Sequence, residues 1–351
     1  MLKEVKSRYA GKSIIYTIII LMFSTPLFSQ GFISDVSKRG TTAAPFLSIG
    51  QGARAIGMGS AFVAVTDDPS AIFWNPAGIT KTKGVSFMVD HTRWIADINY
   101  NFMALSYNLG SFGVLGMSFT ISDVDEMNVT TVEHPEGTGE TFSVTDASFS
   151  IAWAIQLTDK FAIGFNPKFV YQNIWKMSAS AIALDMGVQY VTPFDGMILA
   201  MSISNFGTKM KMEGNSALII YDPDPNSTGN NGNIPAYLQT DSWDLPLNFR
   251  VGLAYQPLKI DNNEITVSID ALHLSDNFES VNVGAEYTFN NFISLRGGYK
   301  SLFLTDSEET FALGFGLRQL LLGNVSVMLD YAYQDFGRLS EIQKFSVAIN
   351  F

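Results

Sequence analysis

The residues of this sequence that could act together chemically are four charged side chains on successive strand-like segments. All four fall on the small-residue face of segments that alternate bulky and small residues, and they are Arg250, Asp270, Glu286 and Arg296. If the connecting turns are centred where their residues indicate, the four lie at similar height on neighbouring strands. They would then form a row of plus, minus, minus and plus, in which the two arginines bridge two carboxylates that otherwise repel each other.

A second pair of opposite charges, Lys168 and Asp185, is expected to meet across two strands in the same way. One interpretation of these charges is a ligand-binding or gating site. The other is that they neutralise one another and hold a neighbouring segment in place, with Arg54 as its contact residue. The second interpretation is favoured, because pairing is the usual way to hold ionisable groups away from water.

Other kinds of chemistry have little support in the sequence. The three histidines stand near strand ends or in a loop, and no nucleophile elbow, zinc-binding helix or phosphate loop is present. Residues 222–233 place oxygen ligands at alternate positions as a calcium loop does, but two prolines interrupt them and Asn233 replaces the bidentate acid. The absence of cysteine removes thiolate catalysis and thiolate metal sites. We therefore expect no enzyme, no bound metal and no cofactor.

The composition predicts a β protein with an apolar exterior. Charged residues make up only 16% of the 351 residues and aromatic residues 13%, and the chain carries 29 glycines. The net charge of -11 argues against nucleic acid as a partner, because a groove for phosphates needs clustered lysines and arginines.

The first 29 residues have the pattern of a secretory signal peptide. Four cationic residues precede a short apolar core at residues 14–23, and a break with Pro26 and small or polar residues leads to a cleavage site near Ser29. The apolar run is about half the ~20 residues that a membrane-spanning helix needs. We therefore expect a signal peptide over residues 1–29 and a mature chain that begins outside the inner membrane.

From residue 84 to residue 351 the sequence reads as about fourteen strands. Large apolar residues alternate with small or polar ones, as at the end of the chain, where they are Phe345, Val347, Ile349 and Phe351. Tight turns alternate with longer connections, the longest at about 121–141 and 207–242. This rhythm is typical of an antiparallel up-and-down sheet with short turns at one end, and an even strand number brings both ends of the sheet there.

Alternation alone cannot distinguish a soluble β-sandwich from a membrane barrel, since either one buries one face of each strand. Three features favour the membrane barrel: the strands are long, they are many, and their polar face is rich in glycine, alanine and serine. An open sheet of this size would also expose an edge, which closure removes. The predicted fold class is an all-β transmembrane antiparallel β-barrel of about fourteen strands, located in the outer membrane and in contact with its lipid.

The segment before the strands, residues 30–83, is predicted to be a plug, or hatch, with a helical turn. Asp68 is expected as the helix N-cap and Pro69 as the first helical residue, and Asn75 before Pro76 should end the turn. The glycines at 50, 52, 57 and 59 allow tight bends and close backbone approach. A segment this irregular cannot face lipid, because its backbone polar groups would be left without hydrogen bonds. We therefore expect it inside or beneath the barrel.

The stretch TTAAPFLSIGQGARAIGMGSAFVAVTDDPSAIFWNPAGI, residues 41–79, resembles the hatch of known outer-membrane barrels. Its part DD followed by SAIFWNPAG is similar to the signature of the FadL-type barrels, which have fourteen strands. The whole stretch more closely resembles the PorV/PorQ family of the same superfamily, which includes type IX secretion components. We take as the hatch signature Gly52, Arg54, Gly57, Gly59, Asp67, Asp68, Trp74, Asn75 and Pro76.

The resemblance also implies a function. The leading expectation is a non-catalytic outer-membrane barrel that assists type IX protein secretion by binding a translocon subunit or an exported cargo domain. The alternative is a FadL-like transporter of long-chain fatty acids or other hydrophobic small molecules. A transporter needs an apolar pocket above the hatch and a break in the wall, whereas a secretion component needs an exposed apolar patch. By resemblance, the terminal Phe351 is the ending that the outer-membrane insertion machinery recognises.

Overall fold

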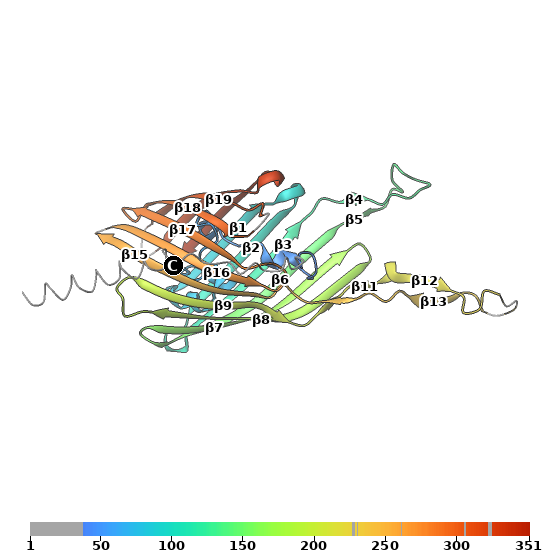
Figure 1. Ribbon diagram of the computed structural model, residues 1–351, viewed down its shortest axis with the longest axis horizontal. Helices are drawn as coiled ribbons and strands as arrows, with labels where there is room; N and C mark the ends of the chain where they lie inside the picture. The colour runs from blue at the N-terminus through green and yellow to red at the C-terminus, as the bar shows by residue number, and fades with distance from the viewer. Residues whose placement is uncertain (1–37, 227–228, 230, 261, 305–306, 322–324) are drawn as a thin grey trace, which may run out of the picture. The chain divides into compact units, whose positions relative to one another are not determined.

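Antiparallel strands make up most of the chain that the computed structural model describes, which is residues 38–351 except 227–228, 230, 261, 305–306 and 322–324. The signal peptide predicted for residues 1–29 lies outside the described residues. Fourteen strands form the wall of a barrel (Figure 1). They are β1 (Val85–Arg93), β2 (Asn99–Asn108), β3 (Val114–Asp123), β6 (Val144–Thr158), β7 (Phe161–Ile174), β8 (Met177–Val191), β9 (Met197–Gly207), β15 (Asn248–Ile260), β16 (Asn263–Leu274), β17 (Ser280–Phe289), β18 (Ile293–Leu302), β19 (Phe311–Leu320), β20 (Ser326–Asp335) and β21 (Glu341–Asn350).

The wall is closed because each of its fourteen strands pairs with a strand on either side. Each strand pairs antiparallel with its neighbour, including β8 with β9, and β1 pairs with β21 to join the two ends of the sheet. Closure leaves no edge strand in the barrel, so its backbone groups are satisfied within the wall. The predicted fold class is confirmed.

The alternation of each strand decides which side chains face the membrane. In β19 the large residues Phe311, Leu313 and Phe315 are exposed on the outer face, and Ala312 on the lumen face is buried. The same division recurs around the barrel, so lipid meets bulky apolar side chains and the lumen is lined by small and polar ones. No helix in the described part of the chain is long and apolar enough to cross a membrane.

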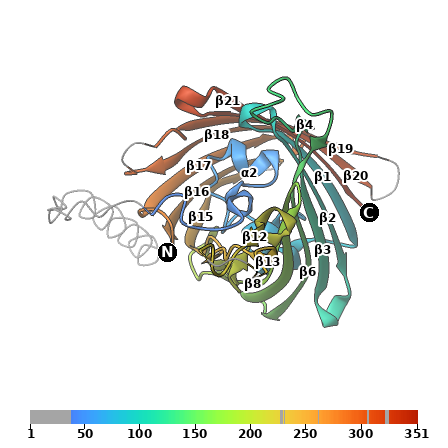
Figure 2. The ribbon, with the colours of Figure 1, turned by 90° about the vertical axis from the view of Figure 1, so that its right-hand side faces the viewer.

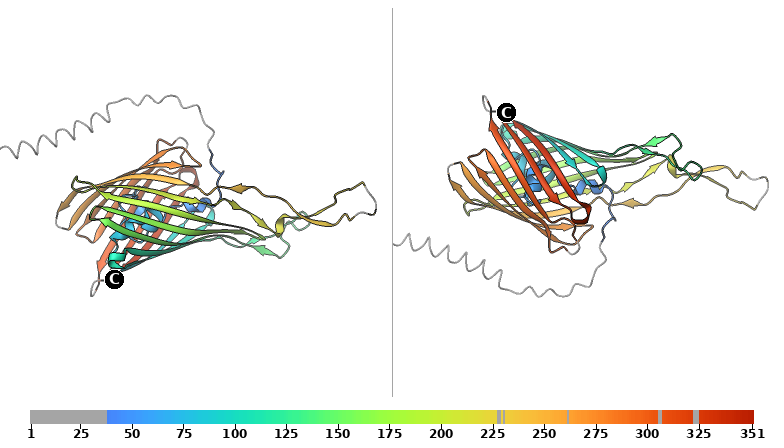
Figure 3. Two further views of the ribbon diagram at one scale, coloured as in Figure 1. Left: turned by 90° about the horizontal axis from the view of Figure 1, so that it is seen from below. Right: turned by 90° about the horizontal axis from the view of Figure 1, so that it is seen from above.

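The two ends of the barrel differ in their connections. Tight turns close one end, as between β17 and β18, where Phe292 N–H donates to the Phe289 carbonyl and the two residues between them, Asn290 and Asn291, both have the positive φ of a type I′ turn. The opposite end carries two hairpins that extend away from the wall (Figures 1 and 3). They are built around β4 (Met127–Asn128) with β5 (Thr141–Phe142), and β12 (Leu218–Tyr221) with β13 (Ile234–Tyr237). Long loops mark the extracellular end of an outer-membrane barrel.

The longest connection, between β9 and β15, contains three further short strands and one helical turn. They are β10 (Met210–Lys211), β11 (Glu213–Gly214), η5 (Asn215–Ala217) and β14 (Ser242–Trp243). Single helical turns also occupy three shorter connections of the wall, namely η3 (Ile95–Asp97), η4 (Gly110–Phe112) and η6 (Gly337–Leu339).

Most of the described residues ahead of β1 lie inside the ring of strands (Figure 2). They form only short helical pieces, which are η1 (Pro45–Ser48), α2 (Ala53–Gly57), α3 (Ala71–Trp74) and η2 (Pro76–Lys81). We call the described residues 38–83 the hatch. Its first residues contact the extracellular loops, where Thr42 donates from Oγ1 to Asp276 Oδ2 at 3.0 Å. Its last turn, η2, packs against β6, β7 and β8 towards the short-turn end, so the hatch runs along the lumen. The boundaries at 29/30 and 83/84 stay predictions.

Candidate functional site

The helical turn of the hatch is built from the residues around its two prolines. The Asp68 carboxylate accepts hydrogen bonds from the backbone N–H of Ser70 at 2.8 Å and from its hydroxyl at 2.5 Å. The N–H of Ala71 donates to the Asp68 carbonyl, and α3 begins at Ala71, two residues after Pro69. At Asn75 the backbone is extended, with φ -160° and ψ 102°, so the helix ends where the following proline requires it to.

Asn75 connects the hatch to itself and to the wall. Its Nδ2 donates to the carbonyls of Val63 and Val188, each at 3.1 Å, and its Oδ1 accepts from the N–H of Ala77 at 3.1 Å. The side chain is completely buried. In the wall, Gly187 makes room for it, because a Cβ there would lie 2.0 Å from Asn75 Oδ1. Sequence reasoning found Asn75 as a helix terminator but missed its bond to β8.

Replacing Asn75 with alanine should loosen the hatch. The substitution removes one hydrogen bond from each of two carbonyls and one N–H in the buried interior, and each such bond contributes about 0.5–1.5 kcal/mol. We expect a lower unfolding temperature and faster proteolysis of the hatch in detergent, and a smaller effect for Pro76→Ala. Asn128→Ala, in the exposed β4–β5 hairpin, is the matched control and should change neither quantity. Wild-type heat stability and protease resistance in N75A would refute the assigned role.

Arg54 is the main electrostatic contact between the hatch and the wall. Its guanidinium donates to Glu286 of β17 through two bonds, Nε to Oε2 at 3.0 Å and Nη2 to Oε1 at 2.8 Å. It also pairs with Asp67 and reaches Asp68 Oδ2 at 3.5 Å. Burial by itself would lower the pKa of Arg54, but the surrounding carboxylates raise it well above its usual value. The arginine is therefore charged at any physiological pH.

The pairing continues from Glu286 around the wall. Glu286 lies directly across from Arg296 of β18, whose Nε donates to Oε2 at 2.5 Å. Arg296 Nη1 in turn reaches Asp330 Oδ1 of β20 at 2.5 Å. Sequence analysis missed Asp330, although its position on the lumen face of an alternating segment could have revealed it. The charges alternate in sign along the series Arg54, Glu286, Arg296 and Asp330. At most 11% of each of these side chains is exposed.

The predicted row of four charges at one height is wrong. Asp270 of β16 lies across from Asn282, four residues from Glu286 along β17, and Arg250 of β15 lies across from Leu272. The stagger between neighbouring strands in a closed barrel shifts the register, so residues that look level in sequence separate in height. Asp270 and Glu286 therefore do not repel each other across one pair of strands, and each makes its own contact with the hatch.

Asp270 holds a different part of the hatch. Its Oδ2 accepts from the backbone N–H groups of Phe62 and Val63, at 2.7 and 2.9 Å. Arg250 lies over the ring of Trp74, with its guanidinium carbon 4.7 Å from the ring centroid. Its contact with the hatch is therefore a cation–π interaction rather than an ion pair with a hatch carboxylate.

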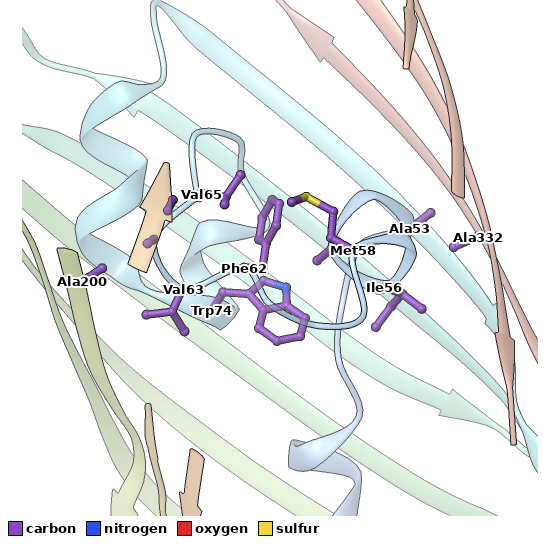
Figure 4. Close-up of a cluster of buried hydrophobic side chains, with 12 residues drawn as sticks. Ala53, Ile56, Met58, Phe62, Val63, Val65, Trp74, Ala200 and Ala332 are labelled. Carbon is purple, nitrogen blue, oxygen red and sulfur yellow. The ribbon is translucent and has the colours of Figure 1, made fainter. Parts of the chain in front are cut away.

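An apolar cluster fills the hatch between these polar contacts. Trp74 and Phe62 pack edge to face, with ring centroids 6.1 Å apart, and Ile56 and Met58 belong to the same cluster (Figure 4). The indole Nε1 of Trp74 donates to the carbonyl of Gln51 at 2.7 Å, so its one polar group is satisfied. The cluster also includes Ala200, Ala254 and Ala332 of the wall, so apolar packing joins the hatch to the wall as well as the charges do.

The second predicted pair is present. Lys168 Nζ lies 2.8 Å from Asp185 Oδ1 and 2.5 Å from Asn205 Oδ1. Asp185 Oδ1 also accepts from the N–H of Asn205 at 2.7 Å. The cluster belongs to the wall and reaches the hatch through Asn166, whose Nδ2 donates to Asp185 Oδ2 at 3.0 Å and to the carbonyl of Ile72 at 3.3 Å.

A third buried group, at the seam between β1 and β21, was missed by sequence analysis. Lys344 Nζ lies 3.4 Å from Asp90 Oδ2, and Ser346 Oγ donates to Asp90 Oδ1 at 2.6 Å. The hatch joins this group, because Gly52 N–H donates to Asp90 Oδ2 at 3.1 Å and Ala53 N–H to Ser346 Oγ at 2.7 Å. Both charged residues stand on lumen-facing positions of alternating segments, which is the signal that could have revealed them.

The signature glycines allow the hatch backbone to touch the wall. Gly52 and Gly59 have φ values of 86° and 62°, in the region that favours glycine. A Cβ on Gly57 would lie 2.9 Å from Gly314 Cα of β19. A Cβ on Gly59 would lie 2.6 Å from the backbone nitrogen of Tyr299. Glycines of the hatch thus face glycines and bare backbone of the wall.

A small cavity lies between the hatch and the strands β2, β3, β6, β7 and β8. Its volume is about 20 Å³. It is lined by both apolar and polar side chains, among them Phe46, Ile72, Phe73, Ser150, Asn166 and Lys168. This volume suits a single water molecule rather than an acyl chain.

The last residue of the chain lies at the seam of the barrel. Phe351 donates its N–H to the carbonyl of Val85 at 2.9 Å, and its side chain is exposed. It extends the pairing of β21 with β1. Its role as an insertion signal stays a prediction.

These features define the class of protein: a fourteen-stranded outer-membrane β-barrel with an N-terminal hatch in its lumen. The family model of the type IX secretion system protein PorV matches residues 34–216, which is more than half of the chain. The chain therefore belongs to the PorV family, and its location is the bacterial outer membrane.

Solved structures with the same fold include transporters of hydrophobic molecules. The monoaromatic hydrocarbon channel CymD is 12% identical, with a TM-score of 0.52, over 86% of this chain and 98% of that one. The Ralstonia pickettii toluene transporter TbuX is 13% identical, with a TM-score of 0.52, over 85% and 96%. A Pseudomonas aeruginosa FadL homologue is 12% identical, with a TM-score of 0.51, over 86% and 98%. At these identities the likeness shows the fold alone. A search of curated proteins gave no match.

Proposed function

We propose that this protein is a non-catalytic outer-membrane barrel that assists type IX secretion by binding a protein through its extracellular loops. The partner is a translocon subunit or the exported cargo itself. Membership of the PorV family supports the pathway. The observation that carries the binding role is the apolar β12–β13 hairpin, which extends beyond the barrel (Figure 3).

This hairpin exposes large apolar side chains on a surface that faces water. Its two strands pair with each other in a sheet of their own, in register from Leu218 opposite Tyr237 to Tyr221 opposite Ile234. The exposed side chains are Leu218, Ile219, Ile220, Tyr221, Ile234, Tyr237 and Leu238. An isolated two-stranded hairpin is only marginally stable in water, and a clustered apolar surface of this kind marks a protein-binding site. Its unpaired strand edges could also accept a partner strand.

The filled lumen supports a role on the surface of the barrel. The hatch is held to the wall by Arg54, Asn75 and the backbone contacts of its glycines. A conduit for cargo or nutrients would require this buried network to be broken. A binding role leaves it intact.

The second candidate function is a FadL-like transporter of long-chain fatty acids or other hydrophobic molecules. The fold shared with hydrocarbon and toluene transporters favours it. Transport would require the hatch to move, because the cavity of about 20 Å³ beside it is too small for such a molecule.

Changing the apolar hairpin should reduce secretion without affecting the barrel. The triple variant Ile220→Ser, Tyr237→Ser and Leu238→Ser removes side chains that are 73%, 63% and 58% exposed. In a bacterium with a type IX system, we expect secreted cargo to fall by about tenfold or more, as for loss of interface anchors. The amount and heat stability of the barrel should remain unchanged.

The matched control is Phe194→Ser, which removes a side chain that is 61% exposed in the turn between β8 and β9, at the opposite end of the barrel. It should leave secretion unchanged. Normal secretion by the triple variant would contradict the proposed binding surface, as would an equal loss in F194S.

A further inference from the structure

A second cavity lies on the outer face of the wall, away from the hatch. It has a volume of about 300 Å³ and lies over β15, β16 and β17 near the extracellular end. This volume is at the lower end of the usual range for small-molecule sites, about 300–1,000 Å³. Most of its exposed lining is apolar. A groove of this size on a barrel wall needs an explanation, because the surrounding outward side chains are large.

The groove exists because a small residue stands between large ones. Ala271 of β16 lies between Val251 of β15 and Val281 of β17 in one cross-strand row on the outer face. Phe249 and Phe303 stand beside this row and line the groove. Phe303, just beyond β18, has a φ of 68° and is 87% exposed, so its ring projects from the wall.

The polar and apolar parts of the groove are separated along the direction of the strands. His273 and Glu279 are bonded through Nδ1 and Oε1 at 2.9 Å, and they stand at the end of β16 and just before β17. Ala271 and Val281 lie further from the loops. The groove therefore has its polar pair at the extracellular side, where Phe249 lies across from His273, and is apolar towards the membrane centre. A membrane lipid has the same order, with its headgroup outside its acyl chains.

The middle of the groove lies over paired strands of the wall. The ladder between β16 and β17 runs without a register shift from Leu272 to Glu264, and the shift between β15 and β16 lies at Tyr255, towards the other end. The ladder between β17 and β18 shifts register between Val281 and Val283, at the edge of the groove, where Asn282 Oδ1 accepts from the N–H of Ser301 at 2.8 Å. An acyl chain over Ala271 therefore rests on a continuous part of the wall.

We propose that the groove binds one acyl chain of a lipid of the outer leaflet. The groove is continuous with the lipid-facing surface of the barrel, and lipid is the medium that surrounds it. A chain lying over Ala271, between Val251, Val281 and Phe303, fills the gap that the small residue leaves. The His273–Glu279 pair lies at the headgroup level. The lipid is a resident of the wall rather than a transported substrate, and this inference is independent of the secretion partner.

The test is lipid retention by the mature protein extracted from outer membranes in a mild detergent. Native mass spectrometry should find about one lipid bound per wild-type barrel. Ala271→Phe fills the groove, and we expect its retention to fall by about tenfold, which corresponds to 1.4 kcal/mol. The matched control is Ala285→Phe, which adds the same ring at an outward-facing alanine of β17 outside the groove, and it should retain lipid as the wild type does.

The mass of the adduct identifies the occupant. A phospholipid or a lipid A species supports the proposal, provided that A271F loses it and A285F keeps it. Equal retention by A271F, equal loss in A285F, a free fatty acid as the only adduct, or no adduct on the wild type would overturn it. Heat-dependent gel mobility of both variants verifies that each barrel is folded, and Ala271→Leu provides a milder filling variant if A271F does not assemble.

Discussion

Replacing Arg54 with methionine should release the hatch from the wall while the barrel itself stays assembled. Arg54 is the one hatch residue that forms a two-bond ion pair with a wall carboxylate, Glu286, among the ion pairs found in the described residues. Without it, Glu286 loses one of its two arginine partners, and Asp68 loses the cation beside it. Removing one partner of a buried ion pair costs about 3–5 kcal/mol. We expect the free energy of the first unfolding transition to fall by that amount.

Limited proteolysis and calorimetry in detergent measure this effect. In R54M, cleavage should appear within residues 38–83 at protease concentrations that leave the wild type intact. Arg54→Lys should be intermediate, because an ammonium cannot donate two parallel bonds to one carboxylate. Lys211→Met, which breaks an exposed pair with Glu213, is the control and should have almost no effect. An R54M hatch as resistant as the wild type would show that the buried charges do not hold it.

Replacing Gly298 with valine should displace the hatch by steric contact alone. A Cβ at Gly298 would lie 2.3 Å from both the backbone nitrogen of Gly59 and the carbonyl carbon of Met58. Backbone cannot rotate away as a side chain can, so the hatch or the wall must move. Overpacking of this kind costs about 1–3 kcal/mol, and more where backbone is involved. The unfolding temperature should fall and the hatch should become sensitive to protease.

The preceding residue of β18 provides the matched control. Gly297 faces outwards, and a Cβ there would have as its nearest neighbour Leu313 Cδ2 at 3.9 Å, which is ordinary contact. Gly297→Val adds the same side chain to the same strand without touching the hatch. If G297V were destabilised as much as G298V, the loss would come from valine in the strand and not from contact with the hatch.

Much of this architecture could be predicted from local sequence patterns. A period of two identifies both the strands and the face that each residue occupies, which is why Glu286, Arg296, Lys168 and Asp185 were all expected in the lumen. The crowding of glycine, proline and small residues in residues 52–80 indicated a plug. These patterns involve only residues close together in the sequence. Closure of the barrel does not change which face of its strand a residue occupies.

What could not be predicted depends on contacts between distant segments. The stagger of the strands separates Asp270 from Glu286 in height, and no local pattern contains that stagger. The pairing of Asp90 with Lys344 joins the two ends of the sheet, 254 residues apart. Residues 222–233 drew attention only for their resemblance to a calcium loop, whereas the paired strands on either side of them, β12 and β13, form a hairpin whose apolar surface was not expected.

The most direct test of the proposed function is site-specific photo-cross-linking in native outer membranes, followed by identification of what is bound. A photoreactive residue at Tyr237, in the exposed hairpin, should capture a translocon subunit or an exported cargo protein. The same residue at Phe194, at the opposite end of the barrel, should capture neither. If Tyr237 captured no protein, and a hydrophobic small molecule were instead extracted from the lumen, the protein would be a transporter and the proposed binding role would be contradicted.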